Sequence, residues 1–143
     1  MGQTFSTELA GVDSVPAVKP SSISAYGARL KRFRATIPLA SQASGDTVVL
    51  ADLPAGYAPA FFIVNTSVTL GTSTIALGNA SSSTAYSAAT TYTAANLPVF
   101  AGNAAMQAGG SGSTTVRILA TIGVAALPAS GTLVIELYAA CAN

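Results

Sequence analysis

The sequence predicts an all-β protein: a single antiparallel β-sandwich, jelly-roll-like, of about 7–8 strands behind an extended N-terminal arm. Apolar and polar residues alternate in several short segments after residue 28, which is the period of a half-buried strand. Turn-forming residues separate these segments every 8–12 residues or so, and no helical periodicity persists. We therefore expect an arm over residues 1–28 and a sandwich domain over residues 29–143.

The arm differs from the body because it shows neither a strand period nor a helix period. Pro16, Pro20 and the serine-rich stretch 21–24 disfavour regular structure there. Apolar residues nevertheless occur along its whole length, so we expect the arm to lie along its own domain or along a neighbouring molecule. These residues are Phe5, Leu9, Val12, Val15, Val18, Ile23 and Tyr26.

The first half of the body contains four expected strands. Residues 29–39 alternate, placing Phe33 and Ile37 on one face, and Pro38 indicates that the strand ends there or lies at a sheet edge. Gly71 and Thr72 predict a tight hairpin into the fourth strand. The expected strands are 29–39, 47–53, 60–70 and 73–77, with turns at 44–46 and 53–56 between the first three.

The second half of the body begins with a Ser/Thr/Ala-rich stretch, residues 80–96, which favours an irregular strand or loop over a helix. The expected elements after it are a short strand at 97–100, one helical turn at 101–107, a glycine-rich loop at 109–113, and strands at 114–122 and 132–140. Segments 48–64 and 122–137 each consist of a strand, a Leu-Pro-Ala turn with a following glycine, and a second strand. This repeat fits pseudo-symmetric halves of one sandwich.

The composition is apolar and poor in charge. Hydrophobic residues make up 50% of the 143 residues, and charged residues only 8%, against roughly 25% in an ordinary soluble domain. The net charge of +1 provides no long-range field for a nucleic acid or an acidic partner. No apolar stretch is long enough to cross a membrane. We therefore expect this chain to bury part of its own surface in contacts with other subunits.

The titratable residues exclude most catalytic chemistry. There is no His, which rules out imidazole acid–base catalysis and the Ser-His-Asp arrangement. No cluster has the spacing of a zinc or calcium site, and no glycine-rich phosphate loop precedes a helix. We therefore expect no enzyme activity, no metal and no cofactor. One enzymatic alternative is a carbohydrate-active sandwich that uses Asp52 and Glu136, although both lie on faces predicted to point outward.

Four of the six basic residues lie within six positions, at Arg29, Lys31, Arg32 and Arg34. Strand alternation puts Arg32 and Arg34 on one face and Lys31 on the side of Phe33. Three interpretations remain open: charges that protect an edge strand, docking onto an acidic patch of a partner protein, or contact with nucleic acid phosphates.

The order of segments resembles that of small virion proteins of tailed bacteriophages and prophages, in particular capsid cement or decoration proteins of siphophage type. The segments that carry the resemblance are the arm with its prolines, RLKRFRATIPLASQASGDTVVLADLPAG, TLGTSTIALG, the Tyr/Thr-rich stretch, and ATIGVAALPASGTLVIELYA. The resemblance implies a β-sandwich that binds the outer capsid surface and bridges neighbouring subunits of the major capsid protein.

The resemblance also implies where the protein acts and with which residues. Copies would meet at symmetry axes as a homo-oligomer, with a trimer expected, on a virion assembled in the cytoplasm of a bacterial host. The interface would comprise the apolar arm residues listed above, Lys19, and the cations Arg29, Lys31, Arg32 and Arg34. The alternative is a tail or fibre-tip module that binds a host surface ligand through exposed Tyr86 and Tyr92. A nucleic-acid partner and a membrane partner are not expected.

Overall fold

The fold consists almost entirely of strands. The computed structural model describes residues 16–17 and 27–141. Its strands are β1 (Arg29–Pro38), β2 (Thr47–Leu53), β3 (Tyr57–Thr66), β4 (Thr74–Asn79), β5 (Ser87–Thr91), β6 (Val99–Ala101), β7 (Val116–Gly123) and β8 (Thr132–Cys141), with one short helix, α1 (Ala104–Ala108). The predicted all-β class and strand number are therefore confirmed, and the arm lies almost wholly outside the described residues.

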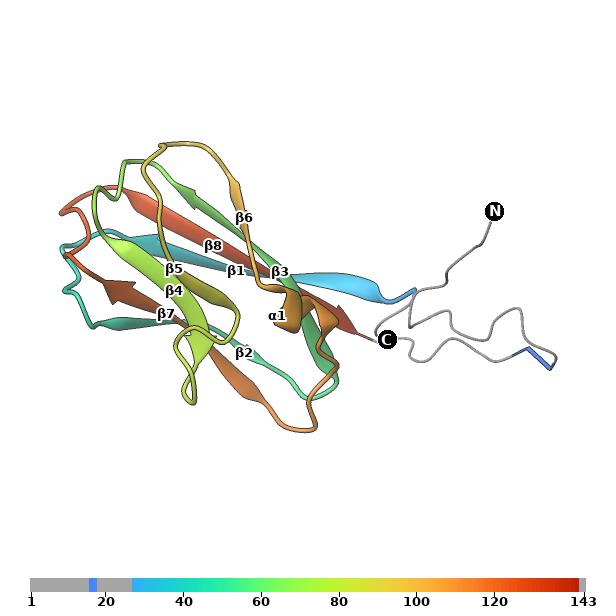
Figure 1. The fold of residues 1–143 in the computed structure, drawn as a ribbon. Helices are drawn as coiled ribbons and strands as arrows, with labels where there is room; N and C mark the ends of the chain where they lie inside the picture. The colour runs from blue at the N-terminus through green and yellow to red at the C-terminus, as the bar shows by residue number, and fades with distance from the viewer. Residues whose placement is uncertain (1–15, 18–26, 142–143) are drawn as a thin grey trace, which may run out of the picture.

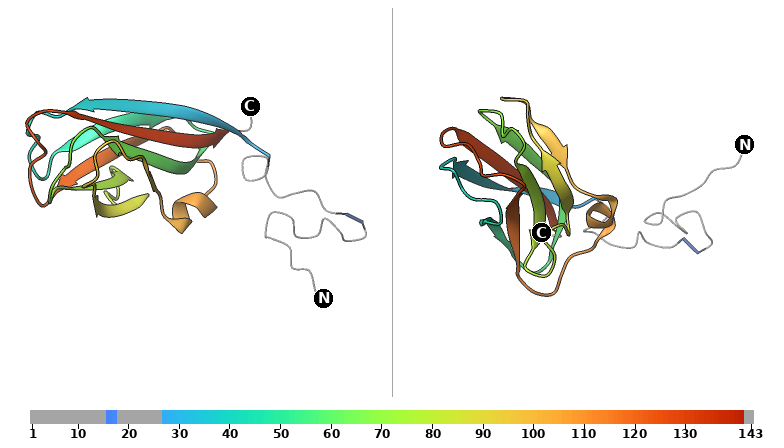
Figure 2. Two further views of the ribbon diagram at one scale, coloured as in Figure 1. Left: turned by 90° about the horizontal axis from the view of Figure 1, so that it is seen from above. Right: turned by 60° about the vertical axis from the view of Figure 1, so that its left-hand side comes forward.

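The strands form two antiparallel sheets of four strands, packed face to face (Figures 1 and 2). Sheet A has the order β1-β8-β3-β6, and sheet B has the order β2-β7-β4-β5. Strand β1 pairs with β8, β2 with β7, β3 with β6 and β4 with β5, so the body is one long hairpin wound into two layers. This winding is the jelly roll, and it confirms the predicted sandwich.

The core lies between the two sheets, and strand alternation accounts for it. In β8, Leu133, Ile135 and Leu137 are each 1% exposed, and the residues between them lie on the outer face. The same period holds in β7, where Ile118 and Ile122 are buried as predicted. In β1, Ile37 is buried and Phe33 packs against the core. The strand ends at Pro38 and forms an edge of sheet A, so both interpretations of that proline hold.

The third predicted strand and the hairpin that follows it require correction. The strand begins and ends earlier than predicted, at 57–66 instead of 60–70. The predicted hairpin at Gly71-Thr72 is wrong, because β3 pairs in sheet A whereas β4 pairs in sheet B. Gly71 has a φ of +62°, so it does serve a turn, but the turn lies within a connection that crosses between the sheets.

The repeated Leu-Pro-Ala segments occupy equivalent places in the fold. The first joins β2 to β3 and the second joins β7 to β8, so each crosses from sheet B to sheet A. Because β2 pairs with β7 and β3 with β8, the two units lie side by side and antiparallel. Gly56 and Gly131 complete the two turns at φ values of +87° and +115°, which only glycine adopts readily. The expected pseudo-symmetric halves are present.

One end of the sandwich is closed by α1, near the place where β1 begins and β8 ends (Figure 1). The side chain of Asn103 caps this helix by accepting a hydrogen bond from the Met106 amide at 2.7 Å. Met106 is 4% exposed and joins the core cluster. In the described part of the chain, no helix has the length and hydropathy that crossing a membrane requires.

Candidate interaction surface

The cations predicted to dock a partner lie on β1, at one edge of sheet A. Arg29, Lys31, Arg32 and Arg34 are all exposed. Lys31 lies on the side of Phe33, as predicted, and its Nζ donates a hydrogen bond to the Tyr57 hydroxyl at 3.0 Å. This hydrogen bond raises the pKa of Lys31. Lys31 is thus held against a tyrosine, which leaves the three arginines as the more accessible charges.

Two of these arginines flank a single carboxylate on the outer face of sheet A. Arg32 lies 3.5 Å from one Glu136 oxygen, and the Tyr138 hydroxyl donates to the other oxygen at 3.0 Å. Arg34 is directly opposite Glu136 in the strand register. Its side chain has neither an ion pair nor a hydrogen bond to any described residue. Arg34 is therefore a cation available to a partner.

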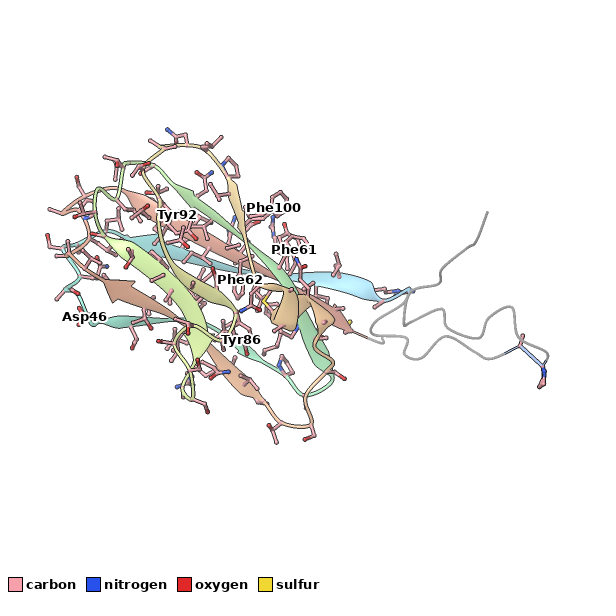
Figure 3. All side chains as sticks on the ribbon, viewed as in Figure 1. Asp46, Phe61, Phe62, Tyr86, Tyr92 and Phe100 are labelled. Atoms are coloured by element: carbon pink, nitrogen blue, oxygen red, sulfur yellow. The ribbon has the colours of Figure 1, made fainter. Side chains whose placement is uncertain are left out.

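The same outer face carries three aromatic rings in a row, from β8, β3 and β6. Phe61 stacks on Tyr138 with ring centroids 4.9 Å apart, and it contacts Phe100 at 5.6 Å. We call Tyr138, Phe61 and Phe100 the aromatic ladder. Phe100 is 73% exposed, whereas the neighbouring Phe62 points into the core and is fully buried (Figure 3). The ladder is an apolar surface beside the cations of β1.

A groove of about 290 Å³ lies on the same face, lined by Ile63, Asn65, Pro98, Val134 and Glu136. Ile63 is paired in register with Phe100, so the groove and the ladder adjoin. Asn65 Oδ1 is buried and has no hydrogen-bond partner in the described part of the chain. An unsatisfied buried acceptor costs about 1–3 kcal/mol, so a donor that reached Asn65 would gain a favourable contact.

The outer face of sheet B has a different character. On this face Arg117 forms an ion pair with Asp52, donating from Nε and Nη2 to the two carboxylate oxygens at 2.7 and 3.0 Å. This contact lowers the pKa of Asp52. Asp52 and Glu136 both point outward, as predicted, but from opposite sheets. They cannot act on one glycosidic bond, so the carbohydrate-active alternative based on this pair is wrong.

The tyrosines predicted to contact a host ligand are not exposed contact residues. Tyr92 is 5% exposed and belongs to the core, and its burial raises the pKa of its phenol. Tyr86 is partly buried, with its ring 6.1 Å from that of Phe62. Both tyrosines belong to the Ser/Thr/Ala-rich stretch, and both rings pack into or against the core. This prediction was wrong, because a stretch without periodicity gives no indication of which residues point inward.

The remaining predicted interface residues lie outside the described residues, so their role stays a prediction: Phe5, Leu9, Val12, Val15, Val18, Lys19, Ile23 and Tyr26. Among the residues that the structure does describe, no three Asp, Glu or Cys side chains gather where they could hold a metal ion. Sequence reasoning missed the aromatic ladder. A signal was present in Phe61-Phe62-Ile63-Val64, because a strand that is apolar at every position presents apolar residues on its outer face as well.

The described body is thus a jelly roll whose most developed outer surface combines aromatic rings, a groove and an available cation. No protein-family model and no curated protein sequence matches the chain. Three solved structures share its fold. A chain of the capsid asymmetric unit of cyanophage Pam1 aligns with a TM-score of 0.67 and 13% identity, over 92% of this chain and 99% of that one.

The other two similar structures also come from bacteriophage capsids. A chain of the capsid of Ralstonia phage GP4 aligns with a TM-score of 0.63 and 19% identity, over 88% of this chain and 92% of that one. A chain of the acidic stable capsid of Helicobacter pylori bacteriophage KHP30 aligns with a TM-score of 0.58 and 9% identity, over 80% and 89%. At these identities the likeness establishes a shared fold.

Proposed function

We propose that this chain is a structural virion protein of a bacteriophage, which binds the outer capsid surface and stabilises the shell by bridging neighbouring capsid subunits. The observation that carries the proposal is the overlap of the fold with chains from three phage capsids, over 80–92% of this chain. Since both chains are covered almost entirely in the first two alignments, the likeness is to a whole capsid component of similar size. The jelly roll itself is also used by proteins with other functions.

The mechanism that we propose is mechanical. A shell filled with genome is held by many weak contacts, and a small protein that spans two capsomers adds buried area to them. Each Å² of apolar surface buried contributes about 25 cal/mol before entropic costs, and the contribution recurs at every copy. The partner is the major capsid protein, and copies meet at symmetry axes as a homo-oligomer, with a trimer expected. The protein is made in the cytoplasm of the bacterial host and acts on the virion surface.

The copy number in purified particles tests this function against a tail location. A capsid-bridging protein is expected in hundreds of copies per particle, because an icosahedral shell repeats its binding site many times. Quantitative mass spectrometry of purified particles, with isotope-labelled peptides of this chain as standards, measures the number. A count of only a few copies would support a tail or fibre-tip module, and absence from particles would rule out both.

Charge reversal on β1 is expected to weaken binding to the capsid. The double variant Arg32→Glu, Arg34→Glu replaces two attractive charges by repulsive ones, so we expect affinity for capsids stripped of this protein to fall about ten- to a hundredfold. The effect is expected to shrink as salt rises. Sedimentation of the labelled protein with stripped capsids, at low and high salt, measures both.

Arg117→Glu is the single-site control for this charge reversal, matched to the reversal of either arginine alone. It also breaks an arginine–carboxylate pair, but on the outer face of sheet B. We expect it to change capsid affinity less than about twofold, because Arg117 does not lie on the face that carries the β1 cations. The fold should be kept, because exposed ion pairs contribute little to stability. An equal loss per reversed charge in both variants would indicate a general effect of charge, and unchanged occupancy of the β1 variant would remove the docking role of these arginines.

A further inference from the structure

We propose that the outer face of sheet A is the docking face of this protein, and that it receives an acidic, apolar-bearing surface of a different protein. The identity of that partner as a capsid shell protein rests on the function proposed above. The face is defined by the aromatic ladder, the adjoining groove and Arg34. Apolar exposure, charge and hydrogen bonding each restrict the partner.

Apolar exposure is concentrated at the β6 edge of sheet A. Phe100, which is 73% exposed, lies on the outer face, whereas Val99 (38% exposed) is paired with the buried Val64 and lies on the other side of the strand. Leu97, just before this strand of three residues, is 55% exposed. The opposite edge of the same sheet, β1, carries four cations and a proline, which discourage edge-to-edge pairing. One edge of sheet A is therefore protected and the other is apolar. An unprotected apolar edge beside an exposed aromatic ring is typical of a protein interface.

The charges argue that the partner is not a second copy. The described residues include three carboxylates: Asp46, Asp52 and Glu136. Arg117 engages Asp52 and Arg32 engages Glu136, while Asp46 accepts the Ala43 amide in its own turn at 2.9 Å. The described body of another copy thus offers Arg34 no carboxylate that is not already engaged, and the chain's other two carboxylates, Glu8 and Asp13, lie outside the described residues. We therefore assign the carboxylate that complements Arg34 to a different protein, and the crosslinking below tests this against a second copy.

The groove adds a hydrogen-bonding requirement. Its apolar walls, Ile63, Pro98 and Val134, fit an aliphatic or aromatic side chain. Asn65 Oδ1 lies there without a donor from any described residue. A partner that inserts an apolar side chain next to one of its own N–H groups would fill the groove and supply this donor. The partner surface therefore combines an apolar anchor, a nearby N–H group and a carboxylate.

Photocrosslinking in assembled particles tests the docking face. Phe100→p-benzoylphenylalanine places a photoreactive group on the ladder, where a 73% exposed side chain tolerates replacement. Val49→p-benzoylphenylalanine is the matched control, because Val49 is 52% exposed on the outer face of sheet B. Particles containing each variant are irradiated, and the adducts are identified by mass spectrometry. We expect position 100 to form adducts with a shell protein, near an Asp or Glu, at least about tenfold more than position 49.

Each other outcome overturns the proposal in a defined way. Adducts between position 100 and a second copy of this chain would make the face a self-interface. Adducts from position 49 in place of position 100 would assign docking to sheet B. Both results leave the proposed function standing, because the variants are present in particles. If wild-type protein is absent from particles, the proposed function fails, and the shell partner fails with it.

A second variant tests the role of the charge without depending on the photoreactive side chain alone. Arg34→Glu, combined with the photoreactive group at position 100, is expected to lower the adduct yield at least about fivefold in low salt. Arg117→Glu in the same background is the control and is expected to leave the yield unchanged. An unchanged yield in the Arg34→Glu variant would remove the acidic partner from the proposal.

Discussion

Phe62→Ala is expected to lower the free energy of unfolding by about 3–5 kcal/mol, because it deletes a ring from the centre of a packed core. Phe62 is fully buried on the inner face of β3, and its ring lies 6.1 Å from that of Tyr86. In a domain of this size the thermal midpoint should fall by roughly 10–20 °C. Chemical denaturation followed by circular dichroism measures the free energy, and differential scanning calorimetry measures the midpoint.

Phe100→Ala is the matched control, since it deletes the same ring from a position that is 73% exposed. Its expected cost is below about 1 kcal/mol, because little surface is removed from water there on folding. Equal losses in the two variants would mean that Phe62 does not lie in the core as described. If the free energy of unfolding is nearly unchanged in Phe100→Ala, position 100 can also be substituted in binding experiments.

Deletion of residues 1–25 is expected to abolish capsid binding while leaving the body folded. Every strand pairing begins at or after Arg29, so the truncated chain retains both sheets. The loss of the apolar arm residues should reduce affinity for stripped capsids by at least about a hundredfold, which corresponds to about 3 kcal/mol. The thermal midpoint of the truncated protein and its sedimentation with stripped capsids are the two measurements.

A shorter truncation is the control for this deletion, because it shortens the arm and keeps its apolar residues. Deletion of residues 1–4 removes none of the predicted interface residues, so it is expected to bind as the full chain does. If the protein without residues 1–25 still decorates particles fully, the arm has no part in docking. The body, including the outer face of sheet A, would then account for all of the binding.

The strands with one buried face could be predicted from the sequence, because alternation directly reflects burial. This holds for β1, β7 and β8, whose inward residues are those that the period selects. The sheet to which a strand belongs could not be predicted in the same way. A signal such as Gly71-Thr72 indicates that the chain turns, but pairing with β7 rather than β3 decides where β4 lies.

The candidate site was predictable only in part. The cations of β1 are conspicuous because four of them lie close together in the sequence. Phe61, Phe100 and Tyr138 come from three strands that only the order of sheet A brings together, so the apolar run at 61–64 indicates an apolar outer face but not which rings join it. The burial of Tyr92 depends likewise on tertiary packing and not on its Ser/Thr/Ala-rich surroundings.

The pairing of β1 with β8 along their full lengths has a consequence for biosynthesis. During translation the first strand of the body has no partner until the last one has been synthesised, and the other pairs of the wound hairpin close from the middle outward. Contacts so distant in sequence form slowly, because loop closure must precede them. The nascent chain therefore cannot complete sheet A before β8 has emerged from the ribosome, so β1 stays without its partner while every other strand of the body is being made.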